Sequence, residues 1–223
     1  MQQRYEYLSA MGIDIWVPRD VGSVPPVATT VIDGCKSPDL ESLAVAVAAC
    51  TRCDLYQART QTVFGVGDPH ADWLIIGEAP GAEEDRMGEP FVGRAGRLLN
   101  AMLQAIGLSR EQVYIANILK CRPPGNRDPR PEEVALCSSY LAAQVNMIAP
   151  RIILALGRIA AQNLLGLSTP IGKMRGQRYT YGESAIPVVV TYHPAYLLRS
   201  PQEKRKTWED LLLAKRTYEE TMG

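Results

Sequence analysis

The sequence predicts an α/β protein: a three-layer α/β/α domain with a central four-stranded parallel sheet, preceded by an N-terminal extension. Four short apolar runs rich in β-branched residues recur along the chain, and segments with helical spacing separate them. Alternation of strands and helices at this interval is typical of a parallel sheet with helices on both faces.

The predicted strands are continuous apolar runs, which suit a sheet that is covered on both faces. They are WLII (73–76), VYIAN (113–117), IILAL (152–156) and PVVVT (187–191). Helices are expected over 94–107, 131–148, 158–166 and 202–221. The loops after the carboxyl ends of parallel strands meet at one edge of the sheet, so we expect the functional groups there.

Residues 1–38 differ in composition from the rest of the chain. Their PRDVGSVPPVATT segment has prolines too closely spaced for a helix and no alternation for a strand, which indicates a linker. Apolar residues between Tyr7 and Trp16 favour either a segment that packs on the domain or a peptide that docks on another protein. The domain itself is expected to occupy residues 39–223.

Composition limits the classes of function. The 223 residues contain no apolar run long enough to span a membrane and no secretion signal, so we expect a cytoplasmic monomer with no membrane partner. Lys and Arg total 24, and Asp and Glu also total 24. A zero net charge excludes binding to nucleic acid through bulk positive charge, so any nucleic-acid surface must be a local cluster of basic residues.

Four of the five cysteines form a candidate metal site. In a reducing compartment, metal binding or catalysis is a better explanation for cysteines than disulfides. Cys50 and Cys53 form a C-x2-C pair that Cys121 and Cys137 could complete, which leaves Cys35 over. Four thiolates suit either tetrahedral zinc or a [4Fe-4S] cluster, and the wide separation of the second pair favours the cluster. Cys137 could instead be a small core residue of its helix.

Seven blocks of sequence together resemble a known family. They are C-x2-C (50–53), VFGVGDP (63–69), GEAPGAEED (77–85), PFVGRAGRLL (90–99), NILKCRPPGNRDPRPEE (117–133), Cys137 and TYHPAYLLR (191–199). The set resembles the family 4 uracil-DNA glycosylases, the iron–sulfur members of the uracil-DNA glycosylase superfamily, over about residues 40–220. This resemblance implies a [4Fe-4S] cluster on the four cysteines and hydrolytic excision of uracil from DNA.

The resemblance also implies which residues recognise the base. Glycosylases extrude the target nucleotide into a pocket that reads its Watson–Crick edge. The amide of Asn117 suits uracil, because its carbonyl accepts from N3–H and its NH2 donates to O4. Phe91 matches the aromatic floor under the flipped ring, although it could be core filler. Glu84 matches a barrier against the C5 methyl group of thymine, and its alternative is a solvated charge in an acidic run.

Catalysis in such a site is largely electrostatic. His193, one of only two histidines, matches the family residue that faces uracil O2. Glu78 follows the first strand and can position or polarise a water molecule. The backbone N–H groups of Ala79 and Gly81 would add further donors to the leaving base.

The resemblance places DNA contacts on the segment 194–199. Leu198 or Arg199 would fill the gap left by the flipped base, which makes uracil-containing DNA the expected partner. Two basic stretches would neutralise phosphates beside the pocket. They are Arg199, Lys204, Arg205 and Lys206, and Lys120, Arg122, Arg127 and Arg130.

Two other functional interpretations compete with that of a uracil-DNA glycosylase. Residues 1–20 weakly resemble the peptide by which the psi subunit of the bacterial clamp loader docks on its chi partner, which suggests a replication-associated binding module with little or no activity. A zinc-bound DNA-binding protein is a weaker alternative. Against both, Glu78, Glu84, Phe91, Asn117 and His193 are all present, which favours catalysis.

Overall fold

The computed structural model describes residues 39–222, and the structural statements below concern that part of the chain. The predicted extension over 1–38 lies outside the described residues, and with it Cys35 and the candidate docking peptide. No described helix is both long and apolar enough to cross a membrane.

The core of the domain is a six-stranded sheet in the order β1-β3-β2-β4-β6-β5. The four inner strands are parallel and are the predicted ones: β2 (Trp73–Gly77), β3 (Val113–Asn117), β4 (Ile152–Leu156) and β6 (Ile186–Thr191). All residues of β2, β3 and β4 are buried, as expected of continuous apolar runs between two layers of helices.

The predicted four-stranded parallel sheet forms the centre of the observed sheet, which has one additional antiparallel strand at each edge. Strand β1 (Val66–Gly67) pairs antiparallel with β3, and β5 (Arg178–Tyr181) pairs antiparallel with β6. Strand β1 has only two residues, and β5 alternates exposed with half-buried side chains. Neither strand is a continuous apolar run, because an edge strand does not need one.

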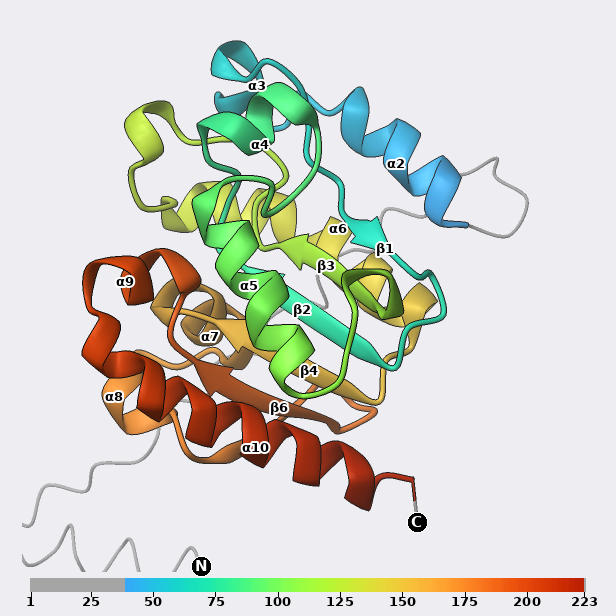
Figure 1. Ribbon diagram of the computed structural model, residues 1–223. Coiled ribbons are helices and arrows are strands. Elements are labelled where there is room, and N and C mark those ends of the chain that lie inside the picture. Colours follow the sequence, from blue (N-terminus) through green and yellow to red (C-terminus); the bar gives the residue numbers. More distant parts are fainter. Residues whose placement is uncertain (1–38, 223) are drawn as a thin grey trace, which may run out of the picture. The chain divides into compact units, whose positions relative to one another are not determined.

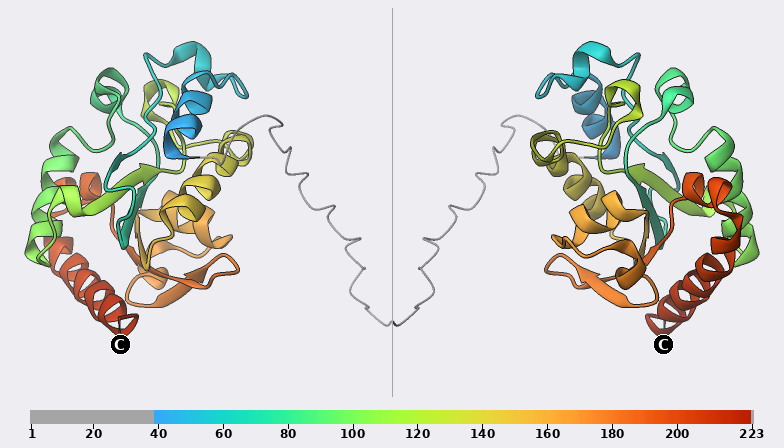
Figure 2. Two further views of the ribbon diagram at one scale, coloured as in Figure 1. Left: turned by 90° about the vertical axis from the view of Figure 1, so that its right-hand side faces the viewer. Right: turned by 90° about the vertical axis from the view of Figure 1, so that its left-hand side faces the viewer.

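Helices cover both faces of the sheet, as predicted (Figures 1 and 2). One face carries α5 (Arg94–Ala105) and α10 (Lys204–Glu220), and the other carries α6 (Pro131–Ile148), α7 (Arg158–Leu165) and α8 (Ile171–Met174). Successive side chains along each strand point to opposite faces of the sheet and belong to two separate hydrophobic cores. Ile75 and Ile115 pack towards α5 and α10, whereas Leu74 and Ile153 pack towards α6 and α7.

Besides α8, four further helices lie outside these predictions. They are α2 (Leu40–Ala48), α3 (Leu55–Ala58), α4 (Ala82–Met87) and α9 (Pro194–Arg199). Short 3-10 turns occupy Arg110–Gln112, Pro124–Asn126 and Pro201–Glu203. The segment 194–199, where DNA contacts are predicted, is a short helix that begins with Pro194, since proline is tolerated in the first turn of a helix.

The topology gathers the strand ends at one edge of the sheet. Strand β2 lies between β3 and β4. The connection from β2 therefore runs to β3 on one side of it, and the later connection from β3 to β4 crosses to the other side. Such a switch point leaves a crevice outside the carboxyl ends of the strands, where ligands of α/β proteins bind. The segments that follow β2, β3 and β6 all begin there.

Candidate active site

A cavity of about 430 Å³ lies at the carboxyl edge of the sheet. Of the predicted site residues it is lined by Glu78, Ala79, Gly81, Glu84, Phe91, Asn117, His193 and Arg199. Pro80, Ala95, Asn126, Arg127, Ala195 and Tyr196 complete the lining. Residues from five separate segments therefore meet in one hollow, hereafter called the pocket.

Asn117 ends β3 with its side chain in the pocket. The residue is almost fully buried, and its Oδ1 atom has no hydrogen-bond partner among the described residues. Buried amide oxygens are rarely left without a donor, so this acceptor is suited to a ligand N–H. Gly77 makes room for it, since a Cβ atom at position 77 would lie 2.4 Å from Asn117 Oδ1.

Phe91 forms one wall of the pocket and is held in a rare backbone conformation. Its φ of 54° lies in the left-handed region, which costs a residue with a side chain roughly 1–3 kcal/mol. Arg110 supports this turn by donating to the carbonyls of Pro90 (2.6 Å) and Phe91 (3.4 Å). The Phe91 ring lies 5.5 Å from the His193 ring, so the two rings line the same hollow.

His193 follows β6 and begins α9. Its Nδ1 atom accepts a hydrogen bond from the backbone N–H of Ala195 at 3.1 Å, so the neutral ring carries its proton on Nε2. Burial, with a smaller effect of the Arg199 charge, lowers the pKa of His193 to about 4. Near neutral pH the imidazole is therefore an uncharged donor with a fixed tautomer. Gly157 permits this placement, because a Cβ there would lie 2.9 Å from His193 Cβ.

Glu78 lies directly after β2 and lines the pocket. Burial, and then the nearby charge of Asp128, raise the pKa of Glu78 to about 7, while Arg158 partly opposes the shift. A carboxyl group with a pKa near neutrality can exchange a proton under physiological conditions, which is typical of catalytic acids and bases.

Glu84 is anchored rather than solvated. Its Oε1 atom accepts from the backbone N–H groups of Val92 (3.1 Å) and Gly93 (3.2 Å), at the start of α5. The carboxylate thus satisfies N–H groups that a helix start leaves free, and it interacts favourably with the helix dipole. These contacts exclude the interpretation as a solvated charge and fix Glu84 as a rigid part of the pocket wall.

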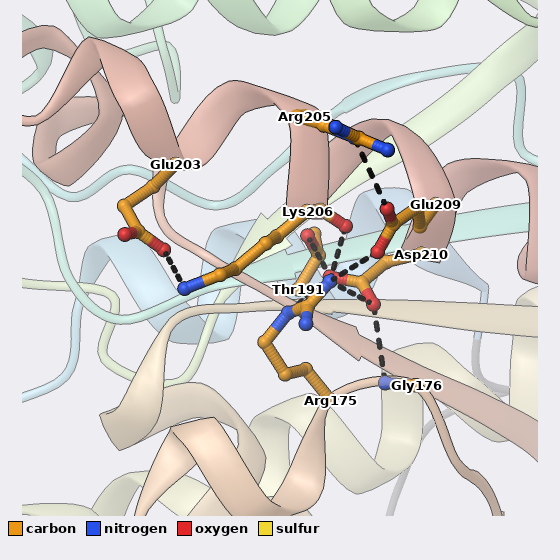
Figure 3. Close-up of polar contacts among 8 residues, drawn as sticks. All are labelled: Arg175, Gly176, Thr191, Glu203, Arg205, Lys206, Glu209 and Asp210. Carbon is orange, nitrogen blue, oxygen red and sulfur yellow. Dashed lines mark hydrogen bonds and ion pairs between the residues drawn. The ribbon is translucent and has the colours of Figure 1, made fainter.

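A buried ion pair holds the strand that delivers His193 (Figure 3). Asp210 of α10 is fully buried and accepts from Thr191 Oγ1 (2.9 Å), Arg175 Nε (3.0 Å) and the backbone N–H of Gly176 (3.1 Å). Thr191 is the last residue of β6, two positions before His193. These contacts join α10, the end of β6 and the segment after α8, two residues before His193.

The predicted DNA contacts divide into two groups. Arg199 lines the pocket, whereas Leu198 is exposed on α9 and does not. Of the basic stretches, Lys206 pairs with Glu203 at 2.8 Å and Arg205 with Glu209 at 3.7 Å.

For the second basic stretch, the prediction of a phosphate contact was wrong at Lys120. Lys120 is only 1% exposed and cannot contact a phosphate. Burial lowers its pKa to about 8. Arg127 reaches the pocket but is held by Glu133 at 2.5 Å.

Sequence reasoning assigned no role to Ala95 or Asn126, which also line the pocket. Asn126 has a φ of 54°, which the Gly-Asn pair at 125–126 could have indicated as a turn. Ala95 gives no sequence signal, since only the docking of α5 brings it to the pocket.

The four predicted metal-binding cysteines line a second, smaller hollow. Cys50 follows α2, Cys53 precedes α3, Cys121 lies beyond β3 and Cys137 is on α6. Burial raises the pKa of the Cys137 thiol to about 11, and it also raises that of Cys121. Arg59 donates to Cys121 Sγ at 3.1 Å and to the Cys50 carbonyl at 2.9 Å. These four residues are called the four-cysteine site below.

The fold and the pocket define a class of protein that the comparisons identify. The model of the uracil DNA glycosylase superfamily matches residues 64–212. A type-4 uracil-DNA glycosylase of Archaeoglobus fulgidus is 47% identical over 178 residues, which are 77% of this chain and 89% of the relative. Its counterpart in Thermotoga maritima is 44% identical over 181 residues, 79% of this chain and 93% of the relative. The chain belongs to the type-4 uracil-DNA glycosylase family.

Proposed function

We propose that this protein removes uracil from DNA by hydrolysing the bond between the base and its sugar, which leaves an abasic site. The observation that carries the proposal is the buried Oδ1 atom of Asn117, which faces the pocket and has no hydrogen-bond partner among residues 39–222. This acceptor matches uracil N3–H, whereas cytosine has a bare acceptor at N3. The family of the relatives supports the same reaction.

Recognition would combine three contacts on an extruded uridine. The Asn117 amide pairs with N3–H and O4, and the Phe91 ring stacks on the base. Glu84 stands beside the C5 edge, where the anchored carboxylate would clash with the methyl group of thymine. Leu198 or Arg199 of α9 occupies the space that the flipped base leaves in the DNA.

Bond breaking places positive charge on the sugar and negative charge on uracil. His193 Nε2–H donates to O2, and the N–H groups of Ala79 and Gly81 add to the stabilisation of the leaving anion. Glu78 orients a water molecule whose oxygen bonds to C1′ while the bond from C1′ to N1 breaks. The water gives up one proton to solvent, and the uracil anion takes one up after departure.

The four-cysteine site would hold a [4Fe-4S] cluster. Its donor set is four thiols, which is the set that such a cluster takes. Among residues 39–222, no three His, Cys, Asp or Glu side chains are grouped so that they could hold a single metal ion. A cluster differs from zinc in that each cysteine binds a different iron, so its ligands need not approach one another closely. Since the hydrolysis transfers no electrons, the cluster would serve to tie the segments of its ligands together.

The direct test is incubation with a labelled oligonucleotide that contains one uracil. We expect an abasic site with uracil and none with thymine or cytosine at the same position. Absence of any abasic product from iron-loaded protein would refute the proposed function.

Activity should depend on pH through Glu78. Because its pKa is about 7, the water-orienting carboxylate forms as the pH rises, so the single-turnover rate should increase through about pH 7. Glu78→Gln should lower the rate and abolish this rise. The exposed neighbour Glu83, changed in the same way, should keep it. A Glu78→Gln profile that matches the wild type would contradict the assignment.

Glu78 should also affect stability, with a definite sign. Its folded pKa of about 7 exceeds the ordinary value of 4.5, so the folded state holds its proton more tightly than the unfolded state does. The stability contribution is therefore present at low pH and is lost as the pH rises through about 7. Glu78→Gln should raise the melting temperature at about pH 8 and leave it unchanged at about pH 4.5. Thermal unfolding at both pH values tests this.

Replacing one cysteine should remove the iron. Cys121→Ser deletes a buried ligand at the end of the segment that carries Asn117, so iron content, melting temperature and DNA affinity should all fall. Cys35→Ser is the matched control and should keep the iron. Full iron content, stability and turnover in Cys121→Ser would contradict a structural cluster at this site.

A further inference from the structure

Lys120 is the largest fully buried side chain of the described chain, and it carries a charge. It lies in the short segment between Asn117, which faces the pocket, and Cys121, which belongs to the four-cysteine site. A buried lysine is rare, because removing an ammonium group from water is costly unless another charge or a set of hydrogen bonds compensates it.

The ammonium group is tied to the base-reading residue. Lys120 Nζ donates to the backbone carbonyl of Asn117 at 2.9 Å and to Gln144 Oε1 at 2.5 Å. Gln144 is itself oriented, because its Nε2 donates to the carbonyl of Phe64 at 2.9 Å. Through these hydrogen bonds the lysine fixes the main-chain carbonyl of Asn117, the residue whose side-chain amide faces the pocket.

The same residue reaches the four-cysteine site. It lines the hollow that contains all four cysteines, and Cys121 is its chain neighbour. Both oxygen partners of Nζ are neutral, and no carboxylate forms an ion pair with Lys120 within residues 39–222. The anion that would compensate this cation is thus the thiolate set itself.

We propose that Lys120 is a positioning residue with two roles: its ammonium group holds Asn117 in place for uracil, and its charge is the internal counter-charge of the iron–sulfur site. The inference rests on the proposed function. A cluster on four thiolates is anionic, and a cation in the low-dielectric interior stabilises its more reduced, more negative form. Lys120 therefore raises the reduction potential of the cluster.

Lys120→Met tests both roles at once, because methionine fills much of the space without charge or hydrogen bonds. The kcat/KM for uracil excision should fall roughly 10- to 100-fold, as expected for losing hydrogen bonds from a charged donor. The midpoint potential, measured by spectroelectrochemical titration of the iron-loaded protein, should shift to a more negative value. The exposed Lys173, changed in the same way, should alter neither quantity.

Gln144→Glu separates the two roles and provides a second variant should Lys120→Met fail to fold. A glutamate at position 144 still accepts from Lys120 Nζ but cannot donate to the Phe64 carbonyl, so kcat/KM should fall less than it does in Lys120→Met. Its negative charge offsets the ammonium group, so the midpoint potential should become more negative.

The outcomes distinguish this inference from the proposed function. A wild-type protein without iron or without uracil excision would refute the proposed function. An active, iron-loaded wild type whose potential equals that of both Lys120→Met and Gln144→Glu would overturn the counter-charge alone. Unchanged kcat/KM in a folded Lys120→Met would overturn the positioning of Asn117.

Discussion

His193→Ala should lower the single-turnover rate of uracil excision by roughly 10²- to 10³-fold, the usual effect of removing one preorganised donor to a developing anion. The geometry gives the reason. Nδ1 is occupied by the Ala195 N–H, so Nε2–H is the only donor of the ring, and its direction is fixed. Rates should be measured with saturating enzyme on a uracil-containing oligonucleotide.

Two controls separate donation from structure. His70→Ala changes the other histidine, which is exposed, and should retain full activity. His193→Ser keeps a side-chain acceptor for the start of α9 but is too short to reach the base. We therefore expect His193→Ser to have the stability of the wild type and the rate of His193→Ala. Recovery of the rate in His193→Ser would show that the residue acts only by capping the helix.

Gly77→Ala should abolish most activity through a single methyl group. The added Cβ would lie 2.4 Å from Asn117 Oδ1 and 2.7 Å from Phe91 Cζ, so the base-reading amide or the stacking ring must move. Displacing a recognition group by about 1 Å can cost roughly 100-fold in rate, and we expect at least that loss in kcat/KM.

The matched control is Gly172→Ala in α8, where an added Cβ meets no atom within 4 Å. It should retain activity and stability. Circular dichroism should show Gly77→Ala to be folded, since the clash involves the ends of two side chains rather than the backbone. A wild-type kcat/KM in Gly77→Ala would contradict the proposed hydrogen bonding of the base by Asn117 and its stacking on Phe91.

The sequence predicted the inner sheet and its helices because burial imposes a readable pattern on them. The apolar runs at 73–76 and 152–156 correspond to β2 and β4, and the helical spacing at 131–148 corresponds to α6. The edge strands escaped prediction for the opposite reason. Strand β5 is only partly covered, so its RYTY sequence carries no apolar run, and only its pairing with β6 makes it a strand.

The pocket residues were predictable where they follow strand ends, as Asn117 and His193 do. The supporting residues were not. Asp210 lies in a helix whose KRKTWED sequence is rich in charge, and only the packing of α10 on β6 buries it. Lys120 lies in a basic stretch that predicted a surface position. In both cases tertiary packing determines burial, and no local pattern records it.

The two outer strands of the sheet have a consequence for how the protein behaves in a concentrated solution. A parallel sheet with bare outer strands would offer unpaired N–H and C=O groups to neighbouring molecules and could grow by accepting their strands. Here one border is a two-residue strand, and the other carries Arg178, whose guanidinium pairs with Glu220. The short strand at one edge and the charged side chain at the other oppose this edge-to-edge pairing between molecules.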